Sequence, residues 1–98
     1  MILEIAQIDV KPGMEAEFEA GVAKAIPIFR RAKGCRAFEA HRSIEMPTRY
    51  RLLIRWDTLE DHTVGFREGP LFNQWRAIVG PFFAAPPVVE HFTLIAKS

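Results

Sequence analysis

Four segments of the chain have the composition or the alternating polarity of β-strands. They are Ile2–Val10, Cys35–Ser43, Arg49–Asp57 and Val88–Ala96. The alternation is clearest in the third segment, where the apolar side chains from Tyr50 to Trp56 occupy every second position. A period of two places these side chains on one face of a sheet, so the pattern predicts strands with one buried face.

The other faces of these strands carry mostly polar residues. The third strand presents Arg49, Arg51 and Arg55 there. We expect these arginines to form a polar surface or a dimer-interface network with Glu4, Glu39 and Glu90. Binding of an acidic substrate is the alternative. On the first strand, Ile2, Ala6, Ile8 and Val10 share one face, and Leu3, Ile5, Gln7 and Asp9 share the other.

Two regions have the three-to-four-residue spacing of amphipathic helices. The first is predicted from Met14 to Lys33, with Gly34 as its C′ residue. The second region begins at Thr58, a good N-cap, and is divided by Gly65 and by Gly69-Pro70. Its later part has an apolar face of Leu71, Phe72, Trp75, Ile78 and Val79.

The predicted order of elements is β-α-β-β-α-β, which is the ferredoxin-like arrangement of an α+β fold. The 98 residues suffice for one domain, covering 1–98, with an antiparallel sheet and helices on one face. Such a fold leaves the other sheet face uncovered. We therefore expect a homodimer in which two sheets face each other.

Composition excludes several other classes of protein. The net charge of +1 gives no electrostatic case for binding nucleic acid or a membrane surface. No apolar run is long enough to span a bilayer, and no signal-peptide pattern is found at the N-terminus. The single cysteine, Cys35, cannot form an internal disulfide and is expected to pack as a small apolar side chain. These features predict a cytoplasmic protein.

Several short motifs resemble those of the antibiotic biosynthesis monooxygenase family. They include Val10-Lys11-Pro12-Gly13 before Glu15-Ala16-Glu17-Phe18, then Gly34-Cys35, Arg55-Trp56-Asp57-Thr58 and Pro70-Leu71-Phe72. The ending with Trp75-Arg76, Pro81-Phe82-Phe83, Pro86-Pro87 and Val89-Glu90-His91-Phe92 adds to the resemblance. The resemblance covers nearly the whole chain and implies a dimeric α+β barrel.

The resemblance also implies a chemistry. Enzymes of the family oxidise phenolic or quinol compounds with O₂ and usually without a cofactor, because an ionised ring can itself donate an electron to O₂. The protein supplies an apolar cavity, a base and groups that stabilise an oxyanion. The resemblance thus points to a monooxygenase acting on a small aromatic molecule. The alternatives are a non-enzymatic barrel that binds an apolar ligand or acts in stress response, and an isomerase or lyase.

The chain departs from the family pattern at the expected base. Many members carry a histidine four residues before the proline of a Ser-Pro pair; here the pair is Gly69-Pro70 and that position holds Phe66. His62 lies one helical turn earlier on a similar face, so it is the predicted catalytic base. Haem-degrading relatives use an asparagine, a tryptophan and a histidine where this chain has approximately Gln7, Gly65 and Arg76, so no haem site is expected.

The remaining candidate site residues are aromatic or histidine. We expect the substrate to contact Trp56, Phe66, Phe72, Trp75 and His91. Each has an alternative role: the tryptophans as core, His91 as a hydrogen-bonded sheet residue and His62 as an exposed residue. His41 shares a face with Glu39 and is expected to form a salt bridge. The sequence contains no metal-ligand cluster and no phosphate-binding loop, so neither a metal nor a cofactor is expected.

Overall fold

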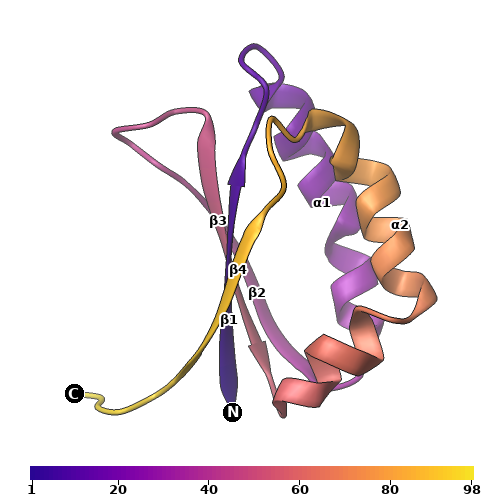
Figure 1. The fold of residues 1–98 in the computed structure, drawn as a ribbon, viewed down its shortest axis with the longest axis vertical. Helices are drawn as coiled ribbons and strands as arrows, with labels where there is room; N and C mark the ends of the chain where they lie inside the picture. Colours follow the sequence, from indigo (N-terminus) through magenta and orange to yellow (C-terminus); the bar gives the residue numbers. More distant parts are fainter.

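The computed structural model describes residues 1–98. Its elements follow the predicted order (Figure 1): strands β1 (Ile2–Asp9), β2 (Cys35–Arg42), β3 (Arg49–Trp56) and β4 (Val88–Thr93), and helices α1 (Glu15–Arg31) and α2 (Pro70–Val79). A π-helical segment, η1 (Asp61–Phe66), precedes α2, and a 3₁₀ turn, η2 (Gly80–Phe82), follows it. The prediction of a ferredoxin-like α+β fold is confirmed.

The four strands form one antiparallel sheet in the order β2-β3-β1-β4. β1 lies between β3 and β4, and its register places Glu4 opposite Ile54 on one side and opposite His91 on the other. Residues at opposite positions point to the same face of a sheet. This register therefore brings Glu4 and His91 to the same face, although they are far apart in the sequence.

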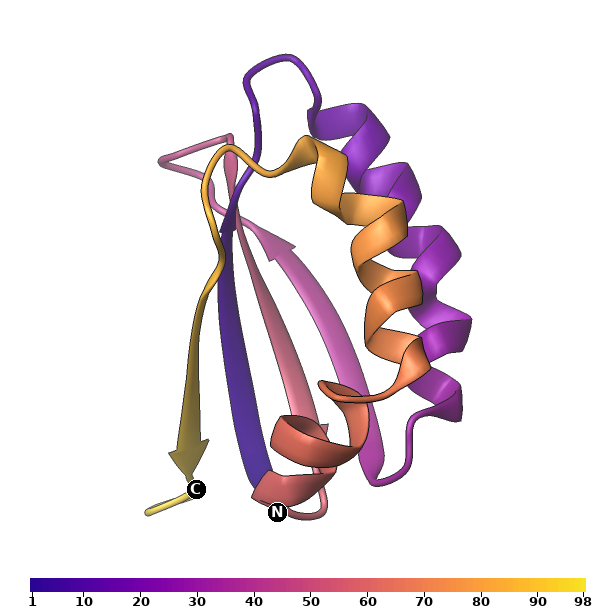
Figure 2. The ribbon, with the colours of Figure 1, turned by 45° about the vertical axis from the view of Figure 1, so that its right-hand side comes forward.

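Both helices cover one face of the sheet and leave the other face open (Figures 1 and 2). The even-numbered residues of β3 point to the helices, and Trp56 is completely buried. The core formed between the layers consists of Ala6, Ile8, Val10, Phe18, Val22, Ala25, Ile28, Phe29, Ala32, Tyr50, Leu52, Ile54, Trp56, Phe66, Trp75 and Val79.

The charge pattern of α1 follows the helix dipole, with Glu15 and Glu17 in the first turn and Arg30 and Arg31 in the last. Against α2, the helix presents Gly21, where an added Cβ would lie 3.3 Å from Ile78 Cγ2. The absence of a side chain there lets the two helices approach closely.

The second helical region is divided at Gly69-Pro70, as predicted, but Gly65 lies inside η1. The hydroxyl of Thr58 accepts a hydrogen bond from the Asp61 amide at 3.1 Å, which confirms it as a capping residue. The Arg67 amide then donates to the carbonyl of His62 at 3.0 Å, the five-residue bond of a π-helix. Four residues make slightly less than one turn of a π-helix. As a result, His62 and Phe66 both face the sheet and both are buried.

Several boundaries differ from the prediction. The helix predicted to Lys33 ends at Arg31, and Gly34 lies in the following turn with a φ of 80°. The strand predicted to Ala96 ends at Thr93, because Thr93 pairs with Ile2, the first residue of β1. The other three strands each end one residue earlier than predicted, and Val10 instead forms an isolated bridge with Phe83.

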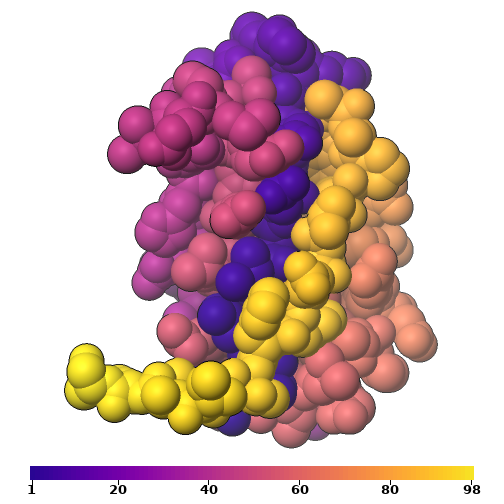
Figure 3. All heavy atoms as spheres, turned by 60° about the vertical axis from the view of Figure 1, so that its left-hand side comes forward, coloured from indigo at the N-terminus to yellow at the C-terminus, as the bar shows by residue number.

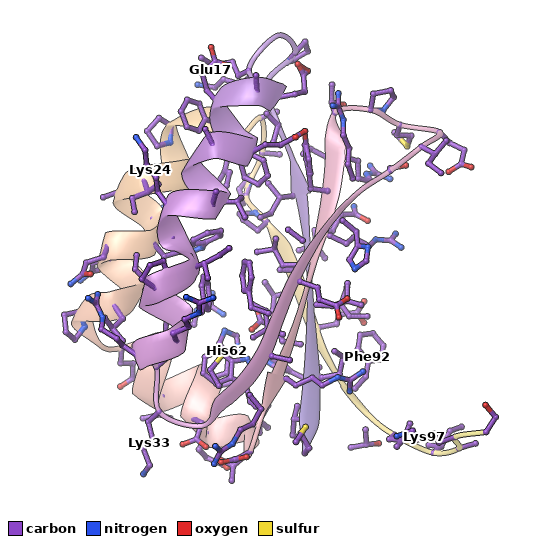
Figure 4. All side chains as sticks on the ribbon, turned by 180° about the vertical axis from the view of Figure 1, so that it is seen from behind. Glu17, Lys24, Lys33, His62, Phe92 and Lys97 are labelled. Carbon is purple, nitrogen blue, oxygen red and sulfur yellow. The ribbon has the colours of Figure 1, made fainter.

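The open face of the sheet carries exposed apolar side chains. Phe92 points away from the helices, on the side of the sheet opposite His62 (Figure 4). Val88 and Phe92 are 59% and 43% exposed. Beyond β4, the last residues extend away from the body of the molecule (Figure 3), and Leu94 and Ile95 are exposed there. None of the helices has the length and apolar character needed to cross a membrane.

Candidate active site

A pocket of about 550 Å³ lies between the sheet and the second helical region. One wall is formed by strand residues such as Ala6, Ile8 and Leu52. Phe66, Phe72 and Trp75 form the opposite wall, and the segment 83–87 closes one side. The polar side chains that line it are Glu4, His62, Arg67 and Arg76. An aromatic pocket with a few convergent polar groups is typical of a small-molecule site.

Four side chains form a polar network beside this pocket, and two of them, Glu4 and His62, line it. His62 Nε2 lies 3.3 Å from Glu4 Oε1, and His62 Nδ1 lies 2.8 Å from His91 Nε2. The indole N–H of Trp56 donates to Glu4 Oε1 at 2.9 Å. Glu4 and His62 are only 5% and 4% exposed. The network therefore runs from a buried carboxyl group, through a buried imidazole, to a partly exposed imidazole on the edge strand β4.

Burial changes the acid–base properties of this network. It raises the pKa of Glu4 to about 7, although the hydrogen bond from Trp56 and the charge of Arg67 act in the opposite direction. The pKa of His62 is lowered to about 4, mainly by burial and in smaller part by the charges of His91 and Arg67. Burial also lowers the pKa of His91. Near neutral pH, His62 is therefore neutral, and Glu4 is present in both its protonated and its ionised form.

The local structure holds both buried groups in place. The ring of His62 stacks on Trp56, with centroids 5.2 Å apart, and Trp56 also contacts Phe66 at 5.5 Å. In Figure 4, His62 lies between the helices and the sheet. Because the π-helical turn aims His62 at the sheet where β1 presents Glu4, the contact depends on the register of β1 and the shape of η1.

Two arginines lie beside the aromatic wall. The guanidinium carbons of Arg67 and Arg76 are each 5.9 Å from the centroid of the Phe72 ring. Both side chains line the pocket. They give the site positive charge near Glu4 and His62, which suits a ligand that develops negative charge.

Comparison with known proteins places this geometry in a family. The family model for antibiotic biosynthesis monooxygenases matches residues 1–78. The chain belongs to the antibiotic biosynthesis monooxygenase family. The match covers most of the residues that line the pocket. It ends before His91, which is hydrogen-bonded to His62.

Similar proteins match this family member along nearly its whole length. A crystal structure from Bordetella bronchiseptica, described as a candidate antibiotic biosynthesis monooxygenase, is 52% identical, with a TM-score of 0.95 and 97% of each chain covered. The Bacillus subtilis (strain 168) protein YczJ, described as uncharacterized, is 39% identical over 92 residues, covering 94% of this chain and 97% of the relative. Rv0793 from Mycobacterium tuberculosis shares the fold at 21% identity and a TM-score of 0.79, covering 99% of this chain and 97% of that protein.

The structure of this antibiotic biosynthesis monooxygenase family member brings most of the predicted site residues together. His62, Phe66, Phe72 and Trp75 all line the pocket. Trp56 is buried beneath it and contacts Glu4 rather than the open space. His91 is hydrogen-bonded to His62, which agrees with its alternative role as a bonded sheet histidine.

The interpretation of Glu4 as a surface residue was wrong. We expected it to join the arginines of β3, but it lies on the helix-facing side, where Trp56 and His62 bind it. Alternation along β1 already carried this information, because position 4 has the parity of Ala6 and Ile8. Arg67 and Arg76 were not predicted as pocket residues either, since their positions depend on how η1 and α2 pack.

The arginines of β3 form separate local contacts. Arg49 Nε pairs with Asp9 Oδ1 at 2.9 Å, and Arg51 donates to the amide oxygen of Gln7. The predicted contact of His41 with Glu39 is present, at 2.9 Å. Cys35 is half-buried and packs against the core, and burial raises the pKa of its thiol. This environment disfavours the thiolate that a nucleophile needs.

Proposed function

We propose that this protein is a cofactor-independent monooxygenase that oxidises a small phenolic or quinol compound with O₂. The observation that carries the proposal is the contact between an aromatic-walled pocket and a buried Glu4–His62–His91 network. Membership of the antibiotic biosynthesis monooxygenase family supports the same chemistry.

The proposed reaction needs only substrate, O₂ and proton transfer. The network removes the proton of a phenolic O–H, and the electron pair stays on the substrate oxygen. The electron-rich anion then reduces O₂, so that one oxygen atom enters the ring and the other leaves as water. A dihydroxynaphthalene would in this way give a hydroxynaphthoquinone and one water for each O₂ consumed.

The pocket suits this substrate class in size and lining. Small-molecule sites have volumes of roughly 300–1,000 Å³, and this pocket measures about 550 Å³. Phe66, Phe72 and Trp75 offer ring faces for stacking. Arg67 and Arg76 supply positive charge that stabilises a phenolate and the oxygen anions formed later.

The experiment is O₂ uptake by purified protein in buffer free of metals and flavin, with a panel of dihydroxynaphthalenes and anthrones. We expect wild-type protein to consume O₂ and His62→Ala to turn over roughly 10²–10⁴-fold more slowly, the usual range for loss of acid–base catalysis. Substrate binding should change much less, because the aromatic wall remains. The matched control is His41→Ala, whose side chain is exposed on β2 and should leave the rate unchanged.

The second candidate function is binding of a small apolar ligand without turnover. The observation that favours it is Phe66, which occupies the position where many family members have a histidine and makes that wall apolar. Tight binding of aromatic compounds with no O₂ uptake from any of the phenols would support this function and reject the monooxygenase.

A further inference from the structure

We propose that Glu4, rather than His62, accepts the proton of the substrate, and that His62 is the positioning residue that holds Glu4. This inference rests on the proposed function, whose base was expected to be a histidine. It follows from which atoms of the network remain free to contact a molecule in the pocket.

Both ring nitrogens of His62 have a close polar neighbour, and Nδ1 is hydrogen-bonded. Nε2 faces Glu4 Oε1 at 3.3 Å and Nδ1 faces His91 Nε2 at 2.8 Å. A neutral imidazole has one N–H donor and one lone pair, and the hydrogen bond with His91 uses the one at Nδ1. With a pKa of about 4, against about 7 for Glu4, His62 is also the weaker base of the two groups.

Glu4 keeps one oxygen available. Trp56 and His62 both contact Oε1, and no side chain or backbone group bonds to Oε2. All fully buried side-chain oxygens and nitrogens of the chain have a hydrogen-bond partner, so Oε2 is not sealed in the core. Since Glu4 lines the pocket, its free oxygen opens toward the space that a ligand would occupy.

The proton transfer is then a single balanced step. The O–H bond of the substrate breaks, an O–H bond forms at Glu4 Oε2, and the electron pair remains on the substrate as phenolate. The indole N–H of Trp56 donates to Oε1, and His62 Nε2 lies 3.3 Å from the same oxygen. These contacts hold Oε1 and leave Oε2 free for the substrate.

The charged and titratable groups around Glu4 come from every neighbouring element. His62 comes from η1, His91 from β4, Arg67 from the segment between η1 and α2, and Cys35 from β2. Burial raises the pKa of Glu4 to about 7, which makes it a stronger base than an exposed carboxylate. Glu4 can therefore both accept and release a proton near neutral pH.

The test follows proton transfer without turnover. A naphthol is mixed with wild-type protein, Glu4→Gln and His62→Gln at pH 8 under nitrogen, and naphtholate is read from its ultraviolet absorption. A phenol with an ordinary pKa of about 10 is neutral in this buffer. In the pocket, the positive charge of Arg67 and Arg76 has to lower the pKa of bound naphthol for Glu4 to take its proton. We expect naphtholate with wild type, little or none with Glu4→Gln, and a reduced amount with His62→Gln. In ¹³C-glutamate-labelled wild type, the Glu4 carboxyl signal, assigned by its loss in Glu4→Gln, should shift to its protonated position when naphthol binds.

The control is Glu90→Gln, which makes the same chemical change at an exposed residue of β4 and should behave as wild type. Equal naphtholate in Glu4→Gln and wild type, or no naphtholate in wild type, would overturn the proposal. Steady-state rates separate it from the proposed function. Naphtholate formed at Glu4 without any O₂ uptake would reject the monooxygenase alone, whereas O₂ uptake undiminished in Glu4→Gln would reject the role of Glu4 alone.

Discussion

At the scale of single residues, the burial of Glu4 and His62 opposes folding. Burial pushes their pKa values in opposite directions, to about 7 for Glu4 and to about 4 for His62. Each group prefers its neutral form in the folded protein. The two groups are neutral at the same time only between about pH 4 and pH 7. Such opposed shifts in neighbouring groups are typical of acid–base sites.

The shift of Glu4 predicts how stability depends on pH. The folded state holds the Glu4 proton up to about pH 7, whereas the unfolded chain releases it near 4.5. Raising the pH through this window therefore lowers the free energy of unfolding through Glu4. The lowered pKa of His62 acts in the opposite sense between about 4 and 6.5. We expect Glu4→Gln to be more stable than wild type by about 1–3 kcal/mol at pH 8, and nearly equal at pH 4.5.

Urea denaturation of both proteins at the two pH values measures this difference. Glu90→Gln serves again as the matched control and should follow the wild-type curve at both. If the gap between Glu4→Gln and wild type were the same at pH 4.5 and 8, Glu4 would not titrate in this window in the folded protein.

Sequence alone predicted part of this site. It identified His62 from its place in the second helical region, and it identified the aromatic wall from helical spacing. It did not identify Glu4, because a carboxylate on a strand with one exposed face is usually a surface residue. The contact depends on burial by Trp56 and on the reach of His62, and neither is encoded in any short motif.

At the scale of elements, α2 and η1 form one side of the pocket, and Trp75 anchors α2 to the rest of the molecule. Its ring packs edge-on against Phe29 of α1, with centroids 5.1 Å apart, and against Phe38 of β2 at 6.4 Å. Trp75 is 6% exposed. It therefore joins α2 to the other helix and to the sheet.

We expect Trp75→Ala to lower the free energy of unfolding by ~3–5 kcal/mol, the usual cost of truncating a large buried aromatic side chain. The midpoint of urea unfolding, followed by circular dichroism, measures the change. Truncation of the half-buried Leu71 on the same helix should cost less. A midpoint unchanged in Trp75→Ala would show that α2 is not held by this contact.

The order and type of the elements were predictable because hydrophobic periodicity and turn residues agree along the chain. Gly69-Pro70 correctly predicted the division of the second helical region, whereas Gly65 lies inside η1 and does not interrupt it. The π-helical form of η1 was not predicted. Apolar spacing does not distinguish a wide turn from an α-helical one over six residues, and only the backbone hydrogen bond from Arg67 to His62 shows it.

At the scale of the whole molecule, the main uncovered surface is the face of the sheet that has no helix packed on it. Partly exposed apolar residues of β1 and β3 lie opposite each other there, at Ile5 and Leu53, and Leu3 of β1 lies opposite Phe92 of β4. Apolar side chains that a sheet exposes to water are stabilised when a second sheet covers them. The homodimer that the sequence predicted remains a proposal on these grounds.

We expect a dimer at micromolar concentration in sedimentation equilibrium, and a shift toward monomer in Leu53→Arg, which places a charge at the centre of this face. Arg51→Lys, a change at an exposed position of β3 that keeps the charge, should remain dimeric as the control. A monomeric wild-type protein at micromolar concentration would contradict the proposed association of sheets.

The most direct measurement of the central claim, that the chain itself performs the oxygenation, is isotopic labelling. Purified wild-type protein, free of metal and flavin, is incubated with a dihydroxynaphthalene under ¹⁸O₂, and the product is analysed by mass spectrometry. The account predicts a hydroxynaphthoquinone carrying one ¹⁸O atom, the other appearing in water, at a rate well above buffer. Absence of product above the buffer rate, or a quinone without ¹⁸O, would contradict it.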